Sequence, residues 1–299
     1  MDVSIIIVNY NTCTLTRNCL KSIFKQTKDI NFEVIVSDNG SNDGSIKMIK
    51  TEFPHVILIE NNTNLGFGTA NNKGLLRATG KYIFLLNSDT ILLNNAVKEF
   101  FEYMESAPKT VACCGCLLQN QEGENIHSYG DFHTLSNCLE EWVWRGIKHK
   151  LFRNYKLLKY DNPKYMHGNS FLVQYVTGAD LFIRTNVIKK CGLFDTVFFM
   201  YSEDMELQRR YQSYGYNSSI IVTAKIAHLV GGSNKKKPLA KNITILKSMF
   251  LYKKKELSSF KYFIFRFVFK LFYCPTIILK KYTFADKFKY LSDVISLKP

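Results

Sequence analysis

The sequence predicts an α/β fold with a mostly parallel central sheet, and three of its features point to that class. Short apolar runs, such as Val3–Val8 and Tyr82–Leu86, have the composition of strands that are buried on both faces. The stretches between such runs are long enough for helices, as in repeated strand–helix units. Polar residues follow where the runs end, as at Asn87, Ser88 and Asp89. Because open α/β sheets bind ligands beyond the carboxyl ends of their strands, we expect a ligand site there.

The first predicted unit is the strand Val3–Val8 and a helix that runs to about Gln26. The residues that link them read N-Y-N-T from Asn9, and Asn11 or Thr12 can cap the helix. The N-terminus, M-D-V-S-I-I-I-V-N-Y, has no basic segment of the kind that begins a signal peptide, so we expect it to form this first strand.

The second predicted strand, Phe32–Val36, leads into the polar stretch S-D-N-G-S-N-D-G-S at 37–45. An acid at the end of the second strand of such a unit is placed to hydrogen-bond the ribose or base of a nucleoside. We predict this role for Asp38 in place of a local Asx-turn. Asp43 is instead expected to cap the following helix.

A third predicted strand, Val56–Ile59, precedes N-L-G-F-G-T-A-N-N-K-G at 64–74, which opens a helix ending near Gly80. A dinucleotide fingerprint would follow the first strand directly and continue G-x-G-x-x-G. Asn71 stands at the place of the third glycine, so the sequence does not predict a nicotinamide-dependent dehydrogenase. A helix start that contains glycine can still let a nucleotide approach the backbone.

Beyond Asp89 we expect a helix over about Asn94–Glu105 and a strand over Thr110–Leu118. The cysteines at 113, 114 and 116 lack a second pair or histidines at zinc spacing, and we interpret them as small buried residues of that strand. Residues 119–170 show no regular pattern. We expect them to form an insertion that shapes an acceptor pocket, with its four histidines at the surface.

The segment Gln174–Arg184 is predicted to be a strand that is broken at Gly178 and Ala179. Small residues at that point would let a substrate lie against the backbone. A short strand at Ser219–Val222 then precedes His228, which stands before a glycine pair. A single histidine in that position is compatible with a purely structural role.

Between these strands, Ser202 is expected to cap a helix that carries Glu203 and Asp204 in its first turn. The helix dipole stabilises acids there by about 0.3–1 kcal/mol, so a structural role for both is one interpretation. Glu206 and Arg210 have the spacing of an i,i+4 ion pair.

The formal net charge of +15 resides almost entirely in the C-terminal part of the chain. Residues 235–299 hold 16 Lys and Arg against 3 Asp and Glu, whereas residues 1–234 hold 24 against 22. Strong basicity suggests a nucleic-acid partner. Here, however, the cations are interleaved with phenylalanine and no recognition motif accompanies them, so we predict no nucleic-acid binding.

The tail has the composition of a segment that lies in a membrane interface. Within Phe260–Leu279, eight of the first fourteen residues are aromatic. Lys261, Arg266 and Lys270 interrupt this run and Pro275 breaks it, which argues against a membrane-spanning helix. Aromatic residues among cations favour binding to anionic lipid. The alternative is a C-terminal helix that packs on the rest of the chain.

Seven motifs in collinear order resemble those of glycosyltransferase family 2, the inverting GT-A transferases, and within it the rhamnosyltransferase-like branch. The motifs are V-S-I-I-I-V-N-Y-N at 3–11, S-D-N-G-S-N-D-G-S at 37–45, N-L-G-F-G-T-A-N-N-K-G at 64–74, L-L-N-S-D-T at 85–90, G-A-D-L-F-I-R at 178–184, F-F-M-Y-S-E-D at 198–204 and H-L-V-G-G-S at 228–233. The resemblance implies a GT-A domain over residues 1–234 with one continuous sheet. Its nucleotide-binding half would be 1–118 and its acceptor half 119–234, followed by the basic membrane-associating tail at 235–299.

The resemblance also implies how a nucleotide-diphosphate sugar would be held. The donor-binding residues would be Asn9, Tyr10 and Asp38 for the base and ribose, Asn64, Gly66 and Asn71 for the nucleotide, and Asn87, Ser88 and Asp89 for the ribose, sugar and diphosphate. Asp89 and His228 would ligate Mg²⁺ or Mn²⁺, and the histidine nitrogen favours Mn²⁺. The family's D-x-D motif is N-S-D here, which leaves one carboxylate for the metal.

For the acceptor, the resemblance implies that Asp204 is the general base that deprotonates a hydroxyl of a glycan or lipid-linked saccharide. The residues expected around the acceptor are Gly178, Ala179, Asp180 and Glu203. Glu206 replaces the second acid of the branch's E-D-x-D motif, and we assign it no catalytic role.

These roles describe a metal-dependent hexosyltransferase of bacterial cell-surface polysaccharide synthesis. We expect it to be cytoplasmic and peripheral at the inner face of the membrane, with dTDP-rhamnose or otherwise a UDP-hexose as donor. The alternative is a catalytically inactive nucleotide-sugar-binding homologue, which Asn87 in the metal motif keeps open.

Overall fold

The computed structural model describes residues 1–132, 134–136, 168–229, 238–273 and 292. The chain divides into two compact units, each made of several segments. The first unit comprises Met1–Asp131, Asn162–Phe199 and Glu203–Lys235, and the second comprises Phe132–Asp161, Met200–Ser202 and Lys236–Pro299.

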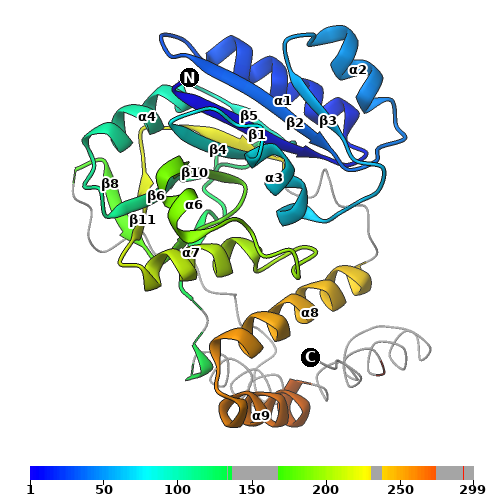
Figure 1. Ribbon diagram of the computed structural model, residues 1–299, viewed down its shortest axis with the longest axis vertical. Coiled ribbons are helices and arrows are strands. Elements are labelled where there is room, and N and C mark those ends of the chain that lie inside the picture. Colours follow the sequence, from blue (N-terminus) through cyan, green and yellow to red (C-terminus); the bar gives the residue numbers. More distant parts are fainter. Residues whose placement is uncertain (133, 137–167, 230–237, 274–291, 293–299) are drawn as a thin grey trace. The chain divides into compact units, whose positions relative to one another are not determined.

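The first unit is built on an eight-stranded sheet in the order β3-β2-β1-β4-β10-β6-β11-β8 (Figure 1). Its strands are β1 (Val3–Asn9), β2 (Phe32–Asp38), β3 (Ile57–Glu60), β4 (Tyr82–Asn87), β6 (Val111–Cys116), β8 (Ser170–Val173), β10 (Asp180–Arg184) and β11 (Asn217–Ile221). Strand β1 pairs in parallel with β2 and β4, and β6 pairs in parallel with β11. Strand β10 runs antiparallel between β4 and β6, and β8 is antiparallel to β11. The predicted mostly parallel α/β sheet is thereby confirmed.

Two small sheets accompany the large one. One joins β5 (Thr90–Leu92) to β12 (Ile226–His228), and the other joins β7 (Tyr129–Gly130) to β9 (Tyr175–Val176). The strand expected over Gln174–Arg184 is therefore two strands, because β9 and β10 pair in different sheets on either side of residues 177–179.

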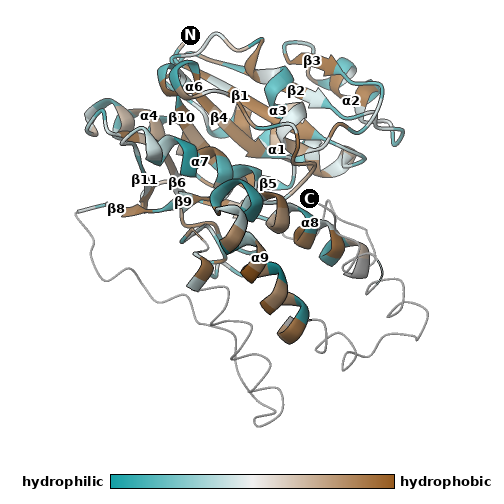
Figure 2. Ribbon diagram, turned by 60° about the horizontal axis from the view of Figure 1, so that its bottom comes forward, coloured by the Kyte–Doolittle hydropathy of each residue, from teal (hydrophilic) through white to brown (hydrophobic). Residues whose placement is uncertain are grey.

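Helices cover both faces of the large sheet because its strands are apolar on both. Along β1, Ile5 and Ile7 belong to the core shared with α1 (Cys13–Gln26), whereas Ile6 belongs to the core shared with α7 (Glu203–Ser213). Figure 2 shows β1 and β4 in the colour of hydrophobic residues. The remaining helices of this unit are α2 (Ser45–Glu52), α3 (Phe67–Leu75), α4 (Ala96–Ser106) and α6 (Thr185–Cys191). Helix α3 ends five residues before Gly80, where the sequence predicted its end.

The starts of the first two helices share one capping side chain. Asp43 Oδ2 accepts a hydrogen bond from the backbone N–H of Cys13 at 2.8 Å, and its Oδ1 accepts one from Ser45 N at 3.1 Å. These are the first residues of α1 and α2, whose N–H groups have no partner within their own helix. Thr12 occupies the N-cap position of α1 as expected, but its hydroxyl makes no capping bond. The cap of α1 therefore comes from a residue thirty positions away.

The cysteines of β6 are buried, as the sequence predicts. Cys113, Cys114 and Cys116 have 0% exposure, and burial raises the pKa of each thiol. Part of the irregular segment 119–170 forms β7 and a turn, but residues 133 and 137–167, with both tryptophans, lie outside the described residues.

In the second unit, the described part of the tail forms helices α8 (Pro238–Glu256) and α9 (Ser259–Val268) with a π-helical turn at Phe269–Tyr273. One face of α9 packs on α8: the ring of Phe250 lies 5.3 Å from Phe265 and 4.8 Å from Phe269. None of the described helices has the length and hydropathy needed to cross a membrane.

Candidate active site

The carboxyl ends of β1 and β2 are held together by a buried polar cluster. Asn9 and Asp38 are partners in the strand register and both have 0% exposure. Asn9 Nδ2 donates to Asp38 Oδ2 at 2.5 Å and to Ser41 Oγ at 3.0 Å. Asn9 Oδ1 accepts hydrogen bonds from the hydroxyls of Thr12 and Thr16. The polar atoms of the Asn9 side chain are thus used to shape the edge of the sheet.

Asp38 forms the local turn that we expected it not to form. Its Oδ1 accepts hydrogen bonds from Gly40 N at 3.1 Å and Ser41 N at 2.8 Å. Gly40 has φ of 77°, which turns the chain so that both N–H groups point at the carboxylate. The rejection of an Asx-turn was therefore wrong. In this structure Asp38 acts through the loop that it organises, and direct contact with a nucleoside stays a prediction.

Tyr10 is the accessible aromatic residue at this edge. Its side chain follows the buried Asn9 and is 43% exposed. An exposed aromatic ring is suited to stacking against a nucleobase.

The start of α3 is held by amide side chains. Asn64 Oδ1 accepts from Gly66 N at 3.0 Å, and Asn39 Nδ2 donates to Asn64 Oδ1 at 3.3 Å and to Gly66 O at 3.2 Å. Gly66 has φ of 85°, and a Cβ there would lie 2.3 Å from the carbonyl oxygen of Phe199. Only glycine fits, because a neighbouring backbone approaches it. Asn64, one of the predicted donor residues, is partly exposed.

Asn71 faces its own helix. It is 1% exposed, and its Nδ2 donates to Phe67 O at 3.1 Å within α3. Its expected contact with the nucleotide would require this buried side chain to become accessible.

The pairing of β5 with β12 brings the two predicted metal ligands together. His228 lies opposite Thr90 in the strand register, and its Nε2 is 3.1 Å from Asp89 Oδ1. Asn87 Nδ2 lies 3.4 Å from the same nitrogen. Leu229 N donates to Asp89 O at 2.8 Å, which extends the pairing past the histidine. Beside them Ser88 is buried, with its Oγ 3.1 Å from Thr12 Oγ1.

The Asp89–His228 pair fits a hydrated divalent cation. Adjacent ligands of an octahedral Mg²⁺ at ~2.1 Å are roughly 3.0 Å apart, and the observed Nε2–Oδ1 distance is 3.1 Å. The described residues contain no group of three or more His, Cys, Asp and Glu that could hold a metal. Two protein ligands with waters and phosphate oxygens suit an ion that binds alongside its substrate.

Asp204 lies at the beginning of α7 and is tied to the backbone of the broken strand. Its Oδ2 accepts a hydrogen bond from Gly178 N at 2.8 Å, and its Oδ1 accepts one from Met205 N at 2.9 Å. The neighbouring Ala179 O accepts from Asn87 N at 3.0 Å. Two consecutive residues therefore connect Asp204 to the end of β4, which leads into the predicted metal site.

Burial raises the pKa of Asp204 above the ordinary aspartate value, against the opposing effect of its backbone hydrogen bonds and of His127. A carboxylate with a raised pKa is a better proton acceptor than an exposed one. The influence of His127, an exposed residue, was not predicted, since no spacing in the sequence connects it to position 204.

The other two predicted acceptor acids are buried. Asp180 has 0% exposure: its Oδ2 accepts from Cys116 N at 2.7 Å, and its Oδ1 has no hydrogen-bond partner among the described residues. Burial raises the pKa of Asp180 to about 8. Glu203 is 4% exposed, and burial, with the adjacent Asp204, raises its pKa well above the usual value. Direct contact of Asp180 with an acceptor is not available in this conformation, because β10 places it inside the sheet.

Sequence reasoning missed several residues that support this site. Gln208 is the clearest: its Oε1 accepts from Val176 N at 2.8 Å and its Nε2 donates to Val176 O at 2.7 Å. It thereby fastens α7 to β9, just before the Gly178–Ala179 step. Asn39 lies inside a recognised motif and could have been found there, whereas nothing around Gln208 marked it.

These features define a class of protein: an α/β sheet with GT-A architecture and polar residues at its carboxyl edge. Solved structures with this fold include a mannosyltransferase from Pyrobaculum calidifontis in complex with GDP-Man and Mn²⁺. It aligns with a TM-score of 0.58 at 15% identity, over 99% of this chain and 69% of its own. Residues 1–349 of TarS from S. aureus align with a TM-score of 0.54 at 14% identity, over 99% of this chain and 71% of theirs. At these identities the likeness shows the fold alone.

Residues 4–176 match glycosyl transferase family 2, and the chain belongs to that family. A glycosyltransferase of Methanocaldococcus jannaschii is 37% identical over 109 residues, covering 35% of this chain and 37% of the relative. YfnE of Bacillus subtilis is 33% identical over 116 residues, covering 38% and 29%. The match thus spans about a third of the length of these two relatives. The N-acetylglucosaminyl-diphospho-decaprenol L-rhamnosyltransferase of Mycobacterium tuberculosis is 23% identical over 235 residues, covering 73% of each chain.

Proposed function

We propose that this chain is a metal-dependent inverting glycosyltransferase that moves a sugar from a nucleotide-diphosphate sugar to a hydroxyl of a glycan or lipid-linked saccharide. The observation that carries the proposal is the Gly178–Ala179 step. It hydrogen-bonds Asp204 on one side and Asn87 on the other, and Asn87 Nδ2 is 3.4 Å from His228 Nε2. A carboxylate with a raised pKa is thereby tied to the site of the predicted metal ligands.

In this proposal Asp204 takes the proton from the acceptor hydroxyl. The hydrogen bonds from Gly178 and Met205 fix the carboxylate, and burial makes it the stronger base. A positioned general base contributes typically 10²–10⁴-fold to a rate. Attack by the deprotonated oxygen on the anomeric carbon, from the face opposite the diphosphate, inverts that centre.

Asp89 and His228 would hold the divalent cation, which is Mn²⁺ or Mg²⁺. When bound, the cation neutralises the negative charge that accumulates on the leaving diphosphate. The mannosyltransferase with the same fold was solved with Mn²⁺, and the histidine nitrogen also favours Mn²⁺.

The donor would lie along the carboxyl edge of β1, β2 and β4. Tyr10 offers an exposed ring to the base, and Asn87 is the partly exposed amide nearest the metal ligands. Asn9 and Asp38 contribute by holding the loop at Gly40–Ser41. We propose dTDP-rhamnose as donor, with a UDP-hexose next, on the strength of the rhamnosyltransferase relative.

The acceptor would lie against Gly178 and Ala179, next to the base. Glu203 and Asp180 would set the polarity beneath it as protonated or partly protonated acids, since burial raises both pKa values. A lipid-linked saccharide of cell-surface polysaccharide synthesis fits the activity for which the Mycobacterium relative is named.

The tail would bring the protein to an anionic membrane surface from the cytoplasmic side. The proposed division is a GT-A domain over residues 1–234 and a membrane-associating tail over 235–299. Support comes from the outward face of α9, where Phe260, Phe263 and Phe267 are 72%, 66% and 59% exposed. Lys261 and Lys270, both exposed, belong to the same helical segment.

Turnover of nucleotide sugars by the purified chain tests the central claim. We expect Mn²⁺-dependent transfer or slow hydrolysis with dTDP-rhamnose or a UDP-hexose. Asp204→Asn should reduce kcat by 10²-fold or more while nucleotide-diphosphate affinity, measured by calorimetry, stays within a few-fold, because only a transition-state interaction is lost.

Two outcomes would contradict this. Near-normal turnover by Asp204→Asn would leave Asp204 as a structural acid at a helix start. Tight nucleotide-sugar binding without any turnover, over a panel of donors and acceptors, would favour the inactive homologue that Asn87 keeps open.

A further inference from the structure

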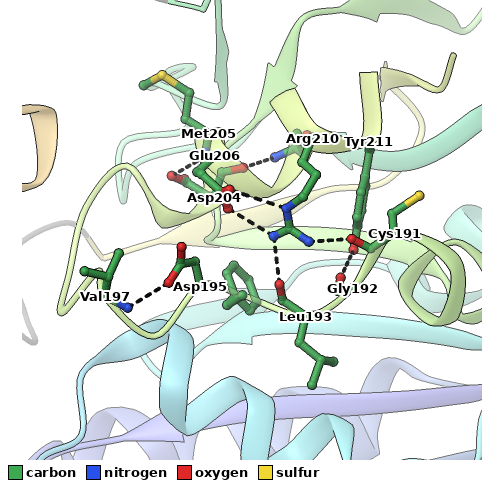
Figure 3. A network of polar contacts seen from close by, with 12 residues as sticks. Cys191, Gly192, Leu193, Asp195, Val197, Asp204, Met205, Glu206, Arg210 and Tyr211 are labelled. Atoms are coloured by element: carbon green, nitrogen blue, oxygen red, sulfur yellow. Dashed lines mark hydrogen bonds and ion pairs between the residues drawn. The ribbon is translucent and has the colours of Figure 1, made fainter. Parts of the chain in front are cut away.

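Arg210 joins helix α7 to the loop at residues 192–199, as Figure 3 shows. Its Nη1 donates to Cys191 O at 2.5 Å and its Nη2 donates to Leu193 O at 2.8 Å. Glu206, one turn earlier on α7, accepts from Arg210 Nη2 at 3.0 Å and from Nε at 3.4 Å. The guanidinium therefore contacts the carbonyl of the last residue of α6, one carbonyl of the loop and one carboxylate of its own helix.

The same loop is held from its other side by α3. Asn72 Oδ1 accepts from Phe194 N at 3.0 Å, and Asn72 Nδ2 donates to Phe194 O at 2.8 Å. Further along, Phe67 N donates to Phe199 O at 2.9 Å. The same carbonyl oxygen leaves no room for a Cβ on Gly66. The 192–199 loop is thus hydrogen-bonded to the beginning of α3 and to α7.

The chain between this loop and Asp204 is conformationally strained. Tyr201 and Ser202 have φ of 73° and 64°, in the left-handed region that residues with a side chain rarely adopt. Such a conformation persists only where the surrounding contacts hold it. It lies immediately before the helical turn that carries Asp204.

We propose that Arg210 is a positioning residue that transmits occupancy of the nucleotide edge at α3 to the helix that carries Asp204. This inference rests on the proposed function, because it takes α3 as part of the donor site and Asp204 as the base. The arginine acts through the 192–199 loop and touches no substrate. Glu206 has a role in this arrangement, which is to orient the guanidinium.

The chemistry of the contact requires arginine. A planar guanidinium can reach two carbonyls and a carboxylate at once, whereas a lysine ammonium is a single flexible point charge. The pair is also partly shielded from water, with side-chain exposures of 26% for Arg210 and 10% for Glu206. Gly192 has φ of 92°, and a Cβ there would lie 3.0 Å from Arg210 Nη1, so the loop is shaped to admit the guanidinium.

Hydrogen–deuterium exchange on the full chain, with and without dTDP or UDP plus Mn²⁺, tests the coupling directly. In the wild type, we expect the nucleotide to slow amide exchange both at the start of α3 and at residues 203–208. In Arg210→Lys, the slowing at α3 should persist while the slowing at 203–208 is lost. The same variant should lower kcat at least tenfold with a change in donor KM of less than threefold.

Arg209→Gln is the matched control, because Arg209 is the exposed neighbour on the same helix. It should behave as the wild type in both measurements. Asn72→Ser removes the hydrogen bonds between α3 and the loop and should give the same loss of coupling. This second variant keeps the test decisive if Arg210→Lys folds poorly.

The proposal is overturned if Arg210→Lys and Asn72→Ser both retain nucleotide-dependent protection at 203–208. It is also overturned if kcat falls only in proportion to a general loss of folded protein. If Arg210→Lys and Asn72→Ser turn over normally while Asp204→Asn is inactive, the proposed coupling is contradicted and the proposed function is still supported. If neither dTDP nor UDP binds the wild type, both the proposed coupling and the proposed function are contradicted.

Discussion

At the scale of single residues, the site is marked by carboxyl groups whose surroundings disfavour charge. Asp180 is enclosed by β4, β6 and β10, with one backbone N–H as partner, and burial raises its pKa to about 8. Burial also raises the pKa of Asp204, although its two backbone donors oppose that shift. Asp180 is suited to stay protonated near neutral pH, whereas Asp204 is suited to accept a proton.

Asp180 should make the protein less stable as the pH rises. Its folded pKa of about 8 lies above the unfolded value of about 4, so the folded state retains a proton that the unfolded chain releases between these values. The contribution of Asp180 to the free energy of unfolding is therefore complete at low pH. It is lost as pH rises towards 8, at up to about 1.4 kcal/mol per pH unit. Asp180→Asn should flatten this slope in urea unfolding at pH 5, 6.5 and 8. Asp29→Asn, an exposed control, should leave the slope unchanged, and equal slopes in wild type and Asp180→Asn would contradict the prediction.

At the scale of secondary-structure elements, two contacts between distant segments create the site. The β5–β12 pairing sets His228 opposite Thr90, and the bond from Gly178 sets the start of α7 against the broken strand. Strand β12 has three residues, so its own propensity contributes little. The position of His228 depends on the pairing and on the hydrogen bond from His228 N to Gln119 O at 2.8 Å.

The metal prediction belongs to this scale. Asp89→Ala should abolish Mn²⁺-dependent binding of dTDP or UDP, and His228→Ala should weaken it less, because water can replace one ligand of a hydrated cation. Calorimetry with and without Mn²⁺ measures both, and EDTA should silence turnover by the wild type. His55→Ala, at an exposed histidine, serves as the control. Unchanged Mn²⁺ dependence in both site variants would remove Asp89 and His228 from the metal role.

At the scale of the whole molecule, charge and exposed apolar surface gather in the same part of the chain. The tail carries most of the net charge of +15. Helix α9 has one buried face, formed by Tyr262 and Phe265 and continued by Phe269 in the π-helical turn, and one exposed aromatic face. Figure 2 shows α9 largely in the colour of hydrophobic residues. An exposed apolar face among cations is the composition of an interfacial helix.

The exposed face should bind anionic vesicles. Changing Phe260, Phe263 and Phe267 together to Ser should abolish sedimentation with phosphatidylserine vesicles and leave the thermal unfolding midpoint nearly unchanged, because these side chains are mostly exposed. High salt should release the wild type, since each nearby cation contributes ~1 kcal/mol of screened attraction.

The matched control changes Leu76 and Leu172, exposed by 72% and 63% outside α9, to Ser. It should sediment as the wild type does. Equal sedimentation of the triple variant, or indifference of the wild type to vesicles of every composition, would contradict membrane binding through this face.

The sequence by itself determined most strands of the large sheet, the family and the order of the polar motifs. The apolar run Tyr82–Leu86 became β4, and the acids followed their strands, because hydrophobic periodicity and turn chemistry act over a few residues. The motif residues Asn9, Asp38 and Asn71 were found in the same way, although the sequence could not show that their side chains are committed to the protein itself.

Only the tertiary structure decided which distant groups meet. His228 reaches Asp89 across 139 residues, Asp43 caps a helix thirty residues earlier, and Asp180 is enclosed because β10 inserts between β4 and β6. Each of these depends on strand order and pairing, which arise from the packing of the entire core and leave no local pattern. Local physics therefore placed the polar groups along one edge, and the assembled sheet determined which of them remain accessible and which are buried.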